Sequence, residues 1–243
     1  MMRFPARLTA KLAKVRIAQI FNFAPAHSLI HCVNTADVLH PGSDAPVSCE
    51  KMQRLIANPS PVIWIGDNES LLHAGIGHFV RAIAQSGHFV FLETDGTFLR
   101  RRMHEFQPLP ELFLTVRIES QQAPEFALVV EGLRAGRHSG FFTVIHSPIH
   151  EDSDVAQLTT LRGFIAENDV DGWVITAGST DQAVVGKAAA ARSLISSGFW
   201  RRFSGHVEEA LLARTQGREL RDASASVAAS SRAETHEEGV GVA

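Results

Sequence analysis

Six short apolar runs alternate with stretches of helical periodicity between Ala26 and about Ile195. Several of the runs are continuous rather than alternating, as in strands that are buried on both faces. Strands that alternate with helices favour a parallel sheet with right-handed crossovers. The predicted strands are Ser28–Val33, Pro61–Ile65, His88–Leu92, Leu112–Ile118, Phe141–Ile145 and Gly172–Ile175.

Three of the intervening stretches carry an apolar stripe at helical spacing. The first stripe ends near Gly87, where a C-cap glycine is expected, and Asp154 with Gln157 suits the start of the third. Further helices are expected over Asp181–Ile195 and Val207–Arg214. The stripes consist of Ile76, Phe79, Val80 and Ile83, then of Phe126, Val129, Val130 and Leu133, and then of Leu158, Leu161 and Ile165.

The length limits the architecture further. A closed eight-stranded barrel usually needs about 250 residues of core, and the whole chain has 243. The sequence therefore predicts an α/β protein, either an open or partial barrel or a doubly wound sheet. We expect an N-terminal amphipathic helix over residues 1–22, the α/β domain over 23–220, and a disordered C-terminal tail over 221–243, which has no aromatic residue.

Composition excludes several classes of protein. The net charge of −3 argues against a dedicated nucleic-acid binder. No apolar run reaches the roughly 18 residues that cross a bilayer, and the N-terminus lacks the apolar core of a secretory signal. Two cysteines, Cys32 and Cys49, exclude a disulfide scaffold and suit the cytoplasm.

The first twenty residues are basic and contain no acid. The favoured interpretation is a helix packed on the outside of the domain. A helix that touches an anionic membrane surface is an alternative, and a cleaved transit peptide is another. The basic residues are Arg3, Arg7, Lys11, Lys14 and Arg16.

Polar groups follow the predicted strands where each strand ends. In parallel α/β folds this carboxyl edge of the sheet carries the functional groups. Surface loops are polar in any case, so the pattern alone is a weak signal. The segments in question are Gly66–Ser70, Glu93–Gly96, Arg117–Glu119, His146–Asp152 and Thr176–Ser179.

Two of these segments carry a family resemblance. Trp64–His73, which reads W-I-G-D-N-E-S-L-L-H, resembles the G-G-E-P or G-D-G-E-P segment of radical S-adenosylmethionine (SAM) proteins. Phe91–Gly96 resembles their T-N-G segment, and Phe126–Ile145 resembles the helix, turn and fifth strand that follow. Arg3–Leu12 resembles the opening of the adenosyl-hopene transferase type. The resemblance implies a partial (βα)6 TIM-type barrel.

The resemblance also implies a place for SAM. In the family, the carboxylate that matches Glu69 hydrogen-bonds the methionine amino group, which is a sound contact between opposite charges. Glycines such as Gly66 and Gly96 let the backbone approach a ligand closely. The candidate SAM-binding residues are Gly66, Asp67, Asn68, Glu69, Glu93, Asp95, Gly96 and Glu119.

The family signature for an iron–sulfur cluster is absent. The family uses C-x3-C-x2-C after the first strand, and its three thiolates hold a [4Fe–4S] cluster that anchors SAM. Neither Cys32 nor Cys49 matches a ligand position, so no [4Fe–4S] cluster is expected. Asn68, Ser70 and Asp95 also replace the usual glycine, proline and asparagine. The ligand positions hold His27, His31 and Asn34 in one register and Asp37, Pro41 and Asp44 in another.

Histidines offer a weaker alternative for a metal. His146 and His150 are followed by Glu151 and Asp152, and imidazole with carboxylate suits zinc or another divalent ion. Pro148 argues against the helix on which an H-x3-H pair usually lies. His27, His31 and His40 lie in the first loop region.

We therefore expect a cytoplasmic, degenerate radical-SAM-like protein that is non-catalytic. It would bind a small ligand, SAM among the candidates, or partner an active radical SAM enzyme or another protein. One alternative is an enzyme that uses SAM or a His/carboxylate metal site, and another is an active radical SAM enzyme. A closed cavity around Glu69 would favour ligand binding, and a collapsed barrel mouth would favour a scaffold.

Overall fold

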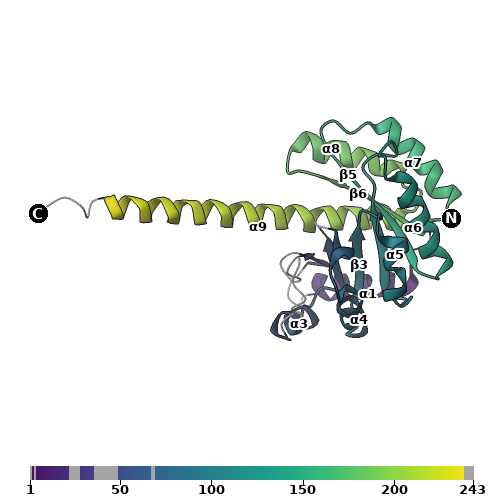
Figure 1. Ribbon diagram of the computed structural model, residues 1–243, viewed down its shortest axis with the longest axis horizontal. Helices are drawn as coiled ribbons and strands as arrows, with labels where there is room; N and C mark the ends of the chain where they lie inside the picture. Colours follow the sequence, from purple (N-terminus) through teal and green to yellow (C-terminus); the bar gives the residue numbers. More distant parts are fainter. Residues whose placement is uncertain (1, 3, 22–27, 36–48, 67–68, 238–243) are drawn as a thin grey trace, which may run out of the picture.

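Six parallel strands form one curled sheet, a half-barrel with strands in sequence order from β1 to β6. The computed structural model describes residues 2, 4–21, 28–35, 49–66 and 69–237, with side chains as far as Gly217. The expected parallel partial barrel is confirmed (Figure 1). The strands are β1 (Ile30–Asn34), β2 (Val62–Gly66), β3 (Phe89–Thr94), β4 (Leu112–Arg117), β5 (Phe142–Ile149) and β6 (Gly172–Ala177).

Helices connect the strands, and the apolar stripes face the sheet. All four residues of the first stripe are buried, namely Ile76, Phe79, Val80 and Ile83. Asp154 accepts a hydrogen bond from the Ala156 N–H (2.8 Å) and caps its helix as expected. The helices are α1 (Ala6–Ile20), α3 (Cys49–Ile56), α4 (Ile76–Gln85), α5 (Leu99–Arg102), α6 (Phe126–His138), α7 (Val155–Glu167), α8 (Gln182–Ala191) and α9 (Gly198–Glu237), with short 3-10 turns at Ser70–Leu72, Met103–Glu105 and Arg192–Leu194.

Strand β5 is longer than the sequence predicts. We expected it to end at Ile145 and to run into a loop, but it continues through Pro148 to Ile149. Alternate residues of a parallel strand bond to opposite neighbours, and the His146 carbonyl accepts from the Ile118 N–H on the β4 side (2.9 Å). Pro148 faces the same side beyond the end of β4, where the strand needs no N–H donor.

An aromatic ladder crosses the middle of the sheet. Trp64, Phe91, Phe113 and Phe142 are in register on β2 to β5, and their neighbouring rings stack at 5.5, 4.4 and 5.4 Å between centroids. The Phe203 ring of α9 lies 5.0 Å from Phe91. Since α4, α6 and α8 pack against the strands from the other side, α9 covers the inner face of the half-barrel.

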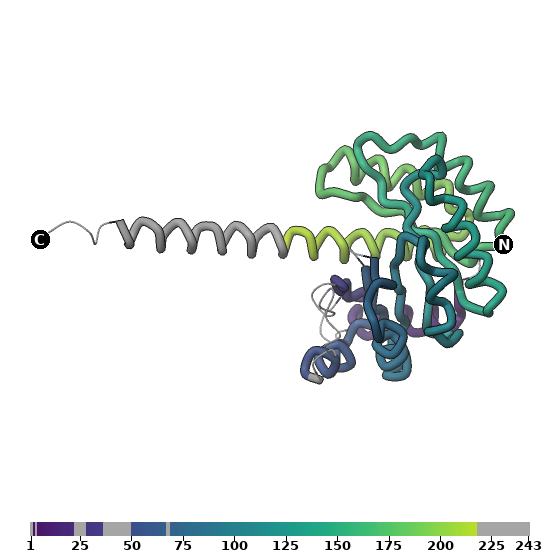
Figure 2. The backbone as a smooth tube through the Cα atoms, viewed as in Figure 1, coloured from purple at the N-terminus to yellow at the C-terminus, as the bar shows by residue number. Residues whose placement is uncertain are grey.

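Helix α9 runs in the same direction as β6. Trp200 packs on Gly172, the first residue of β6, where an added Cβ would lie 2.2 Å from the indole ring. Four residues further along α9, Ser204 accepts from the Ile175 N–H (3.2 Å). One turn later, Glu208 accepts from the Ala177 N–H (2.6 Å) at the end of the strand. The helix therefore leaves the domain at the carboxyl edge of the sheet, as Figures 1 and 2 show.

Helix α9 also differs from its expected length. It contains the predicted helix over Val207–Arg214 and starts nine residues earlier, because Trp200 and Phe203 continue its buried stripe. It is helical to Glu237, so most of the expected tail from residue 221 belongs to this helix, in keeping with the helix propensity of its alanine, arginine and glutamate. Disorder stays a prediction for residues 238–243, which lie outside the described residues.

The N-terminal helix packs on the outside of the domain through Leu8, which is fully buried. Phe4, just before it, contacts the Trp200 ring at 4.8 Å. The far end of α1 leaves Ile20 70% exposed and Phe21 63% exposed. No helix in the described part of the chain is both long and apolar enough to cross a membrane.

The contact between Gly172 and Trp200 gives a first prediction. Gly172→Ala would push a methyl group into the indole and should lower the free energy of unfolding by about 1–3 kcal/mol, as overpacking does. Gly186→Ala is the matched control, because Gly186 is exposed on α8 and its added Cβ would meet open space. That control should stabilise by about 0.5–1 kcal/mol. Urea denaturation measures the free energy of unfolding of both variants. A Gly172→Ala variant as stable as the wild type would contradict the packing of α9 on β6.

Candidate functional site

The carboxyl ends of β2 and β3 are joined through the side chain of Glu69. Its carboxylate accepts from the Leu71 N–H (2.8 Å), the Thr94 hydroxyl (2.8 Å) and the Asp95 N–H (2.7 Å). Glu69 also caps the 3-10 turn Ser70–Leu72. The candidate SAM anchor is therefore a crosslink between two strand ends, and its lone pairs are largely occupied within the chain.

Burial raises the pKa of Glu69 to about 7. The hydrogen bonds from Asp95, Leu71 and Thr94 favour the ionised form and oppose this shift, whereas the charge of Asp95 adds to it. The carboxyl therefore keeps its proton to a higher pH than an ordinary glutamate does. It is thus a weaker partner for an ammonium group than a fully ionised carboxylate.

Gly66 makes room for a carboxylate of the chain itself. A Cβ added at Gly66 would lie 2.8 Å from Oε2 of Glu93. That same oxygen accepts from Nε1 of Trp64 (2.7 Å). The sequence predicts that Gly66 lets a ligand approach the backbone, but in the structure the space belongs to Glu93.

Glu93 is the centre of a buried polar cluster above the aromatic ladder. Its Oε1 lies 3.4 Å from Nδ1 of His146 and 3.8 Å from Nη1 of Arg117. Burial on its own would raise the pKa of Glu93, but the neighbouring His146 ring, the Trp64 hydrogen bond and the Arg117 guanidinium hold it below its ordinary value. The carboxylate is therefore ionised and neutralised inside the barrel.

The cluster continues from His146 to Thr176. Nε2 of His146 lies 2.9 Å from Oγ1 of Thr176, so a carboxylate, an imidazole and a hydroxyl follow one another. Catalytic triads use this order to activate a nucleophile. Thr176 is only 1% exposed, and Glu93 and His146 are buried as well. A substrate cannot reach the hydroxyl, so the cluster holds β3, β5 and β6 together.

The other candidate residues lie at the same edge but in separate roles. Asp95 accepts from the N–H (2.8 Å) and hydroxyl (2.7 Å) of Thr97, and Gly96 adopts φ 86°, so both shape the turn after β3. Glu119 pairs with Nε of Arg117 at 3.5 Å and is 56% exposed. Asp67 and Asn68 lie outside the described residues.

The partners that occupy these carboxylates could not be predicted from the sequence. Trp64 and Thr94 lie in the two segments that carry the family resemblance, and Arg117 and Thr176 lie in the polar strand-end segments, but the sequence does not show which carboxylate each one contacts. Only inward-facing polar residues at alternate strand positions, such as Glu93 in an otherwise apolar strand, signalled a buried cluster.

The first loop region offers little to an iron–sulfur cluster. Cys32 lies within β1, and burial raises the pKa of its thiol to about 12, whereas metal ligands are thiolates. Burial also lowers the pKa of His31, with a smaller effect of His88. Asn34 is buried at the end of β1. The other residues in question, His27, His40, Asp37, Pro41, Asp44 and the Cys49 side chain, lie outside the described residues.

The structure does not bring His146 and His150 into one site. His146 points into the barrel toward Glu93, whereas the His150 ring packs over Gly178, 2.4 Å from where a Cβ would be. Within the described ranges, no group of three or more His, Cys, Asp or Glu side chains could hold a metal ion. The described residues at this edge of the sheet therefore do not come together as a metal site.

Comparison with known proteins supports the fold. No protein-family model matches the sequence, and no curated protein matches it. SuiB of Streptococcus suis bound to S-adenosylmethionine is similar with a TM-score of 0.53 and 10% identity, over 72% of this chain and 47% of SuiB. SuiB bound to the precursor peptide SuiA gives 0.53 and 10%, over 72% and 45%. An archaeal TYW1 gives 0.48 and 11%, over 82% and 94%.

The likeness to SuiB supports the partial α/β barrel of this chain. At such low identity it shows the fold alone. The chain spans less than half the length of the SuiB chains that it matches.

The pKa of Glu69 gives a second prediction. The folded protein holds this proton with a pKa of about 7, against an ordinary value of 4.5. Relative to Glu69→Gln, the free energy of unfolding of the wild type should therefore fall as the pH rises from about 4.5 to 7. The fall should be on the order of 2–3 kcal/mol, because one pKa unit corresponds to about 1.36 kcal/mol.

Denaturant unfolding at a series of pH values measures this difference. Glu167→Gln, at the exposed end of α7, is the control and should follow the wild type throughout. A constant difference between wild type and Glu69→Gln over this range would mean that Glu69 titrates as it does in the unfolded chain.

Proposed function

We propose that this chain is a cluster-free relative of the radical SAM enzymes that performs no radical chemistry and works by binding. One observation carries the proposal: α9 runs along the inner face from one edge of the half-barrel to the other and fills it with Trp200 and Phe203. In parallel barrels the carboxyl edge is where substrates are handled. Here the same edge is where the chain's own helix leaves.

The side chains at that edge support the same conclusion. The carboxylates of Glu69 and Glu93 accept hydrogen bonds from neighbouring strands and do not line an open site. The buried thiol of Cys32 is a poor iron ligand. The whole chain has two cysteines, of which Cys32 is buried, and these do not fit the three thiolates that hold a [4Fe–4S] cluster.

A protein or peptide is the partner that we favour. SuiB, which shares the fold, has been seen with a precursor peptide. An active radical SAM enzyme is one candidate for this partner. We also propose that the protein is cytoplasmic and that it does not bind nucleic acid. The net charge of −3 supports the latter.

Contact of α1 with an anionic membrane surface is a further part of the proposal. The exposed face of α1 combines Lys14 and Arg16 with exposed Ile17, Ile20 and Phe21. Such a pairing of basic and apolar side chains suits the interface of an anionic bilayer. Sedimentation with phosphatidylserine vesicles tests it, and equal recovery with neutral vesicles would remove it.

SAM binding without cleavage is the second candidate function. Glu69 supports it, because a carboxyl stands at the strand end where the family resemblance expects one. SuiB bound to SAM shows only that the fold can hold SAM in that protein. The high pKa of Glu69 and its internal bonds make any such binding weak.

Anaerobic reconstitution with iron and sulfide tests the main proposal. We expect no stoichiometric [4Fe–4S] absorbance and less than one iron per chain after desalting, because one chain has two cysteines and Cys32 is buried. Stoichiometric iron and acid-labile sulfide in a monomer would contradict the proposal.

Calorimetric titration with SAM separates the two candidate functions. If SAM binds, Glu69→Gln should weaken it by roughly 10- to 150-fold, as the loss of a charge-assisted hydrogen bond does. Glu167→Gln is the matched control, and circular dichroism checks that both variants fold. No heat with the wild type would remove SAM as the ligand and leave the partner proposal.

A further inference from the structure

A groove of about 210 Å³ lies between α1 and the start of α9. Helix α1 rests against the amino edge of the sheet, where the strands begin. Its Lys11 donates to the Gly87 carbonyl just before β3. Its Arg7 pairs with Glu111 just before β4 (3.7 Å). Leu29, which precedes β1, also lines the groove. The groove is therefore at the opposite end of the half-barrel from the candidate SAM-binding residues.

The walls of the groove are apolar and can be reached from solvent. Phe199 of α9 is 51% exposed, although its ring stacks on Phe4 at 5.7 Å between centroids. Leu12 is half-buried and Ala13 is exposed on the facing side of α1. A hydrocarbon chain along these walls would cover apolar surface that now faces water, which is favourable.

The charged side chains of the groove are basic. Arg16 and Arg202 line it, and none of the described residues that line it is acidic. Arg16 forms no hydrogen bond or ion pair with a described residue. Arg202 donates only through Nε, to the Gly198 carbonyl (3.4 Å), and its guanidinium lies 5.6 Å from the centre of the Phe199 ring. The terminal nitrogens of both arginines can thus pair with an anion such as a carboxylate.

His206 adds a polar group that carries little charge at neutral pH. Burial lowers the pKa of His206, the positive charge of Arg16 lowers it further, and Glu209 opposes the shift. The Glu209 side chain is 82% exposed and lines the neighbouring hollow, not the groove itself. An anion is therefore favoured where Arg16 and Arg202 stand.

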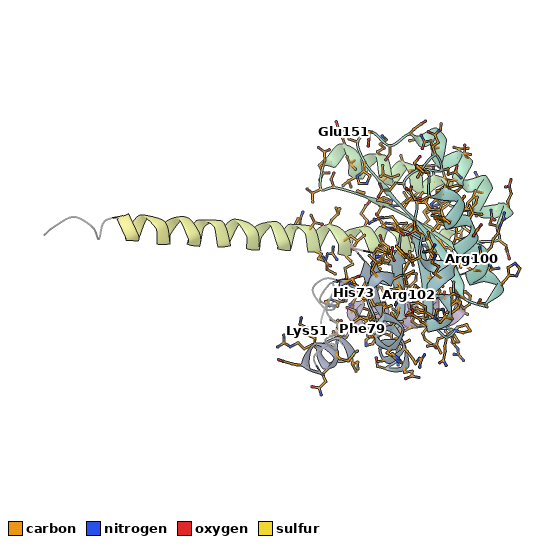
Figure 3. The ribbon with its side chains drawn as sticks, in the orientation of Figure 1. Lys51, His73, Phe79, Arg100, Arg102 and Glu151 are labelled. Carbon is orange, nitrogen blue, oxygen red and sulfur yellow. The ribbon has the colours of Figure 1, made fainter. Side chains whose placement is uncertain are left out.

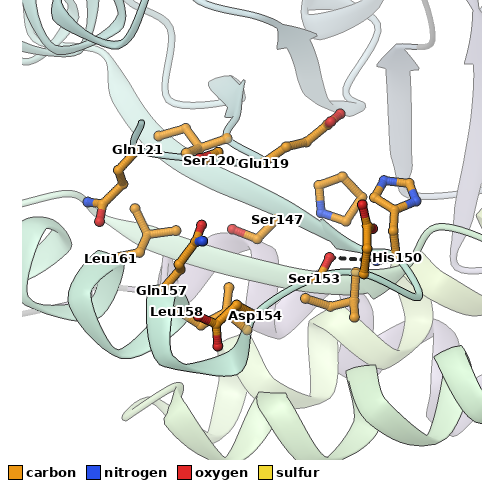
Figure 4. A pocket seen from close by; sticks show the side chains of 14 residues that line it. Glu119, Ser120, Gln121, Ser147, His150, Ser153, Asp154, Gln157, Leu158 and Leu161 are labelled. Atoms are coloured by element: carbon orange, nitrogen blue, oxygen red, sulfur yellow. Dashed lines mark hydrogen bonds between the residues drawn. The ribbon is translucent and has the colours of Figure 1, made fainter. Parts of the chain in front are cut away.

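Two other surface features lack this combination of free basic groups and apolar walls. Arg100 and Arg102, labelled in Figure 3, already pair with Glu131 and Glu105. A larger cavity of about 520 Å³ lies between β5 and α7 at the carboxyl edge (Figure 4). Carboxylates line that cavity, and no described lysine or arginine does, so it disfavours an anion.

We propose that the groove between α1 and α9 binds a medium-chain fatty acid as its anion. The carboxylate pairs with Arg16 and Arg202, and the hydrocarbon chain lies along Phe4, Leu12 and Phe199. The volume is below the usual range for drug-sized ligands, which suits a single hydrocarbon chain. This inference goes beyond the proposed function, which places a membrane surface at the exposed end of α1 and assigns no soluble ligand to this groove.

Calorimetric titration of the full chain with octanoate, octanol and acetate tests the proposal. Octanol keeps the hydrocarbon chain without the charge, and acetate keeps the charge without the chain. We expect one octanoate per chain and at least about tenfold weaker binding of each of the other two. No heat with octanoate, or equal affinity for octanol or acetate, would overturn the proposal. Since no vesicles are present, a failure of membrane binding would leave this result unaffected.

Variants test the placement of the site. The double variant Arg16→Gln, Arg202→Gln should weaken octanoate about tenfold. The control Arg101→Gln, Arg162→Gln makes the same change in net charge at two exposed positions and should stay within twofold of wild type.

Filling the groove is the second test of placement. Ala13→Trp should abolish octanoate binding by occupying the space between the helices, and circular dichroism checks that the variant folds. Unchanged octanoate affinity in Ala13→Trp or in the double arginine variant would place the binding elsewhere and overturn the proposal.

Discussion

The packing of α9 along the inner face of the sheet determines how this half-barrel is built. A partial barrel has two edge strands and an open inner face, and both need a cover. Trp200 fits over Gly172, and Phe203 covers the aromatic ladder at Phe91. Ser204 and Glu208 then take the N–H groups that β6 would otherwise leave unpaired, while Arg192 donates to the Ile175 carbonyl (3.1 Å) and pairs with Glu208. One helix thus supplies apolar cover and edge pairing together.

The polar layer above the ladder follows from this closed interior. Glu93 is ionised although it is buried, which is tolerable only because Trp64, His146 and Arg117 surround it. Removing one partner of such a pair typically costs about 3–5 kcal/mol, so the cluster ties the strands together. The inward carboxylate of this half-barrel thus contributes to the stability of the fold.

The sequence predicted the sheet well because continuous apolar runs and helical stripes report burial directly. The predictions from the sequence were wrong or incomplete where contacts between distant parts of the chain determine the structure. The run from Phe141 was expected to end before His146, since proline and histidine are common in loops, but Pro148 lies beyond the last bond to β4 and is tolerated. Glu69 stood correctly at a strand end, yet its bonds to Thr94 and Asp95 depend on how β2 and β3 are placed. The docking of Trp200 was not predicted, because two aromatic residues carry no periodicity of their own.

Amide hydrogen exchange along β6 tests the central claim most directly. Val174 and Thr176 bond to β5, whereas Ile175 and Ala177 face outward, where only Ser204 and Glu208 of α9 can accept their protons. If α9 seals the half-barrel, all four amides should exchange slowly, near the rate set by global unfolding. Fast exchange at Ile175 and Ala177 beside protected Val174 and Thr176 would mean an open edge and an accessible interior, and would contradict the account.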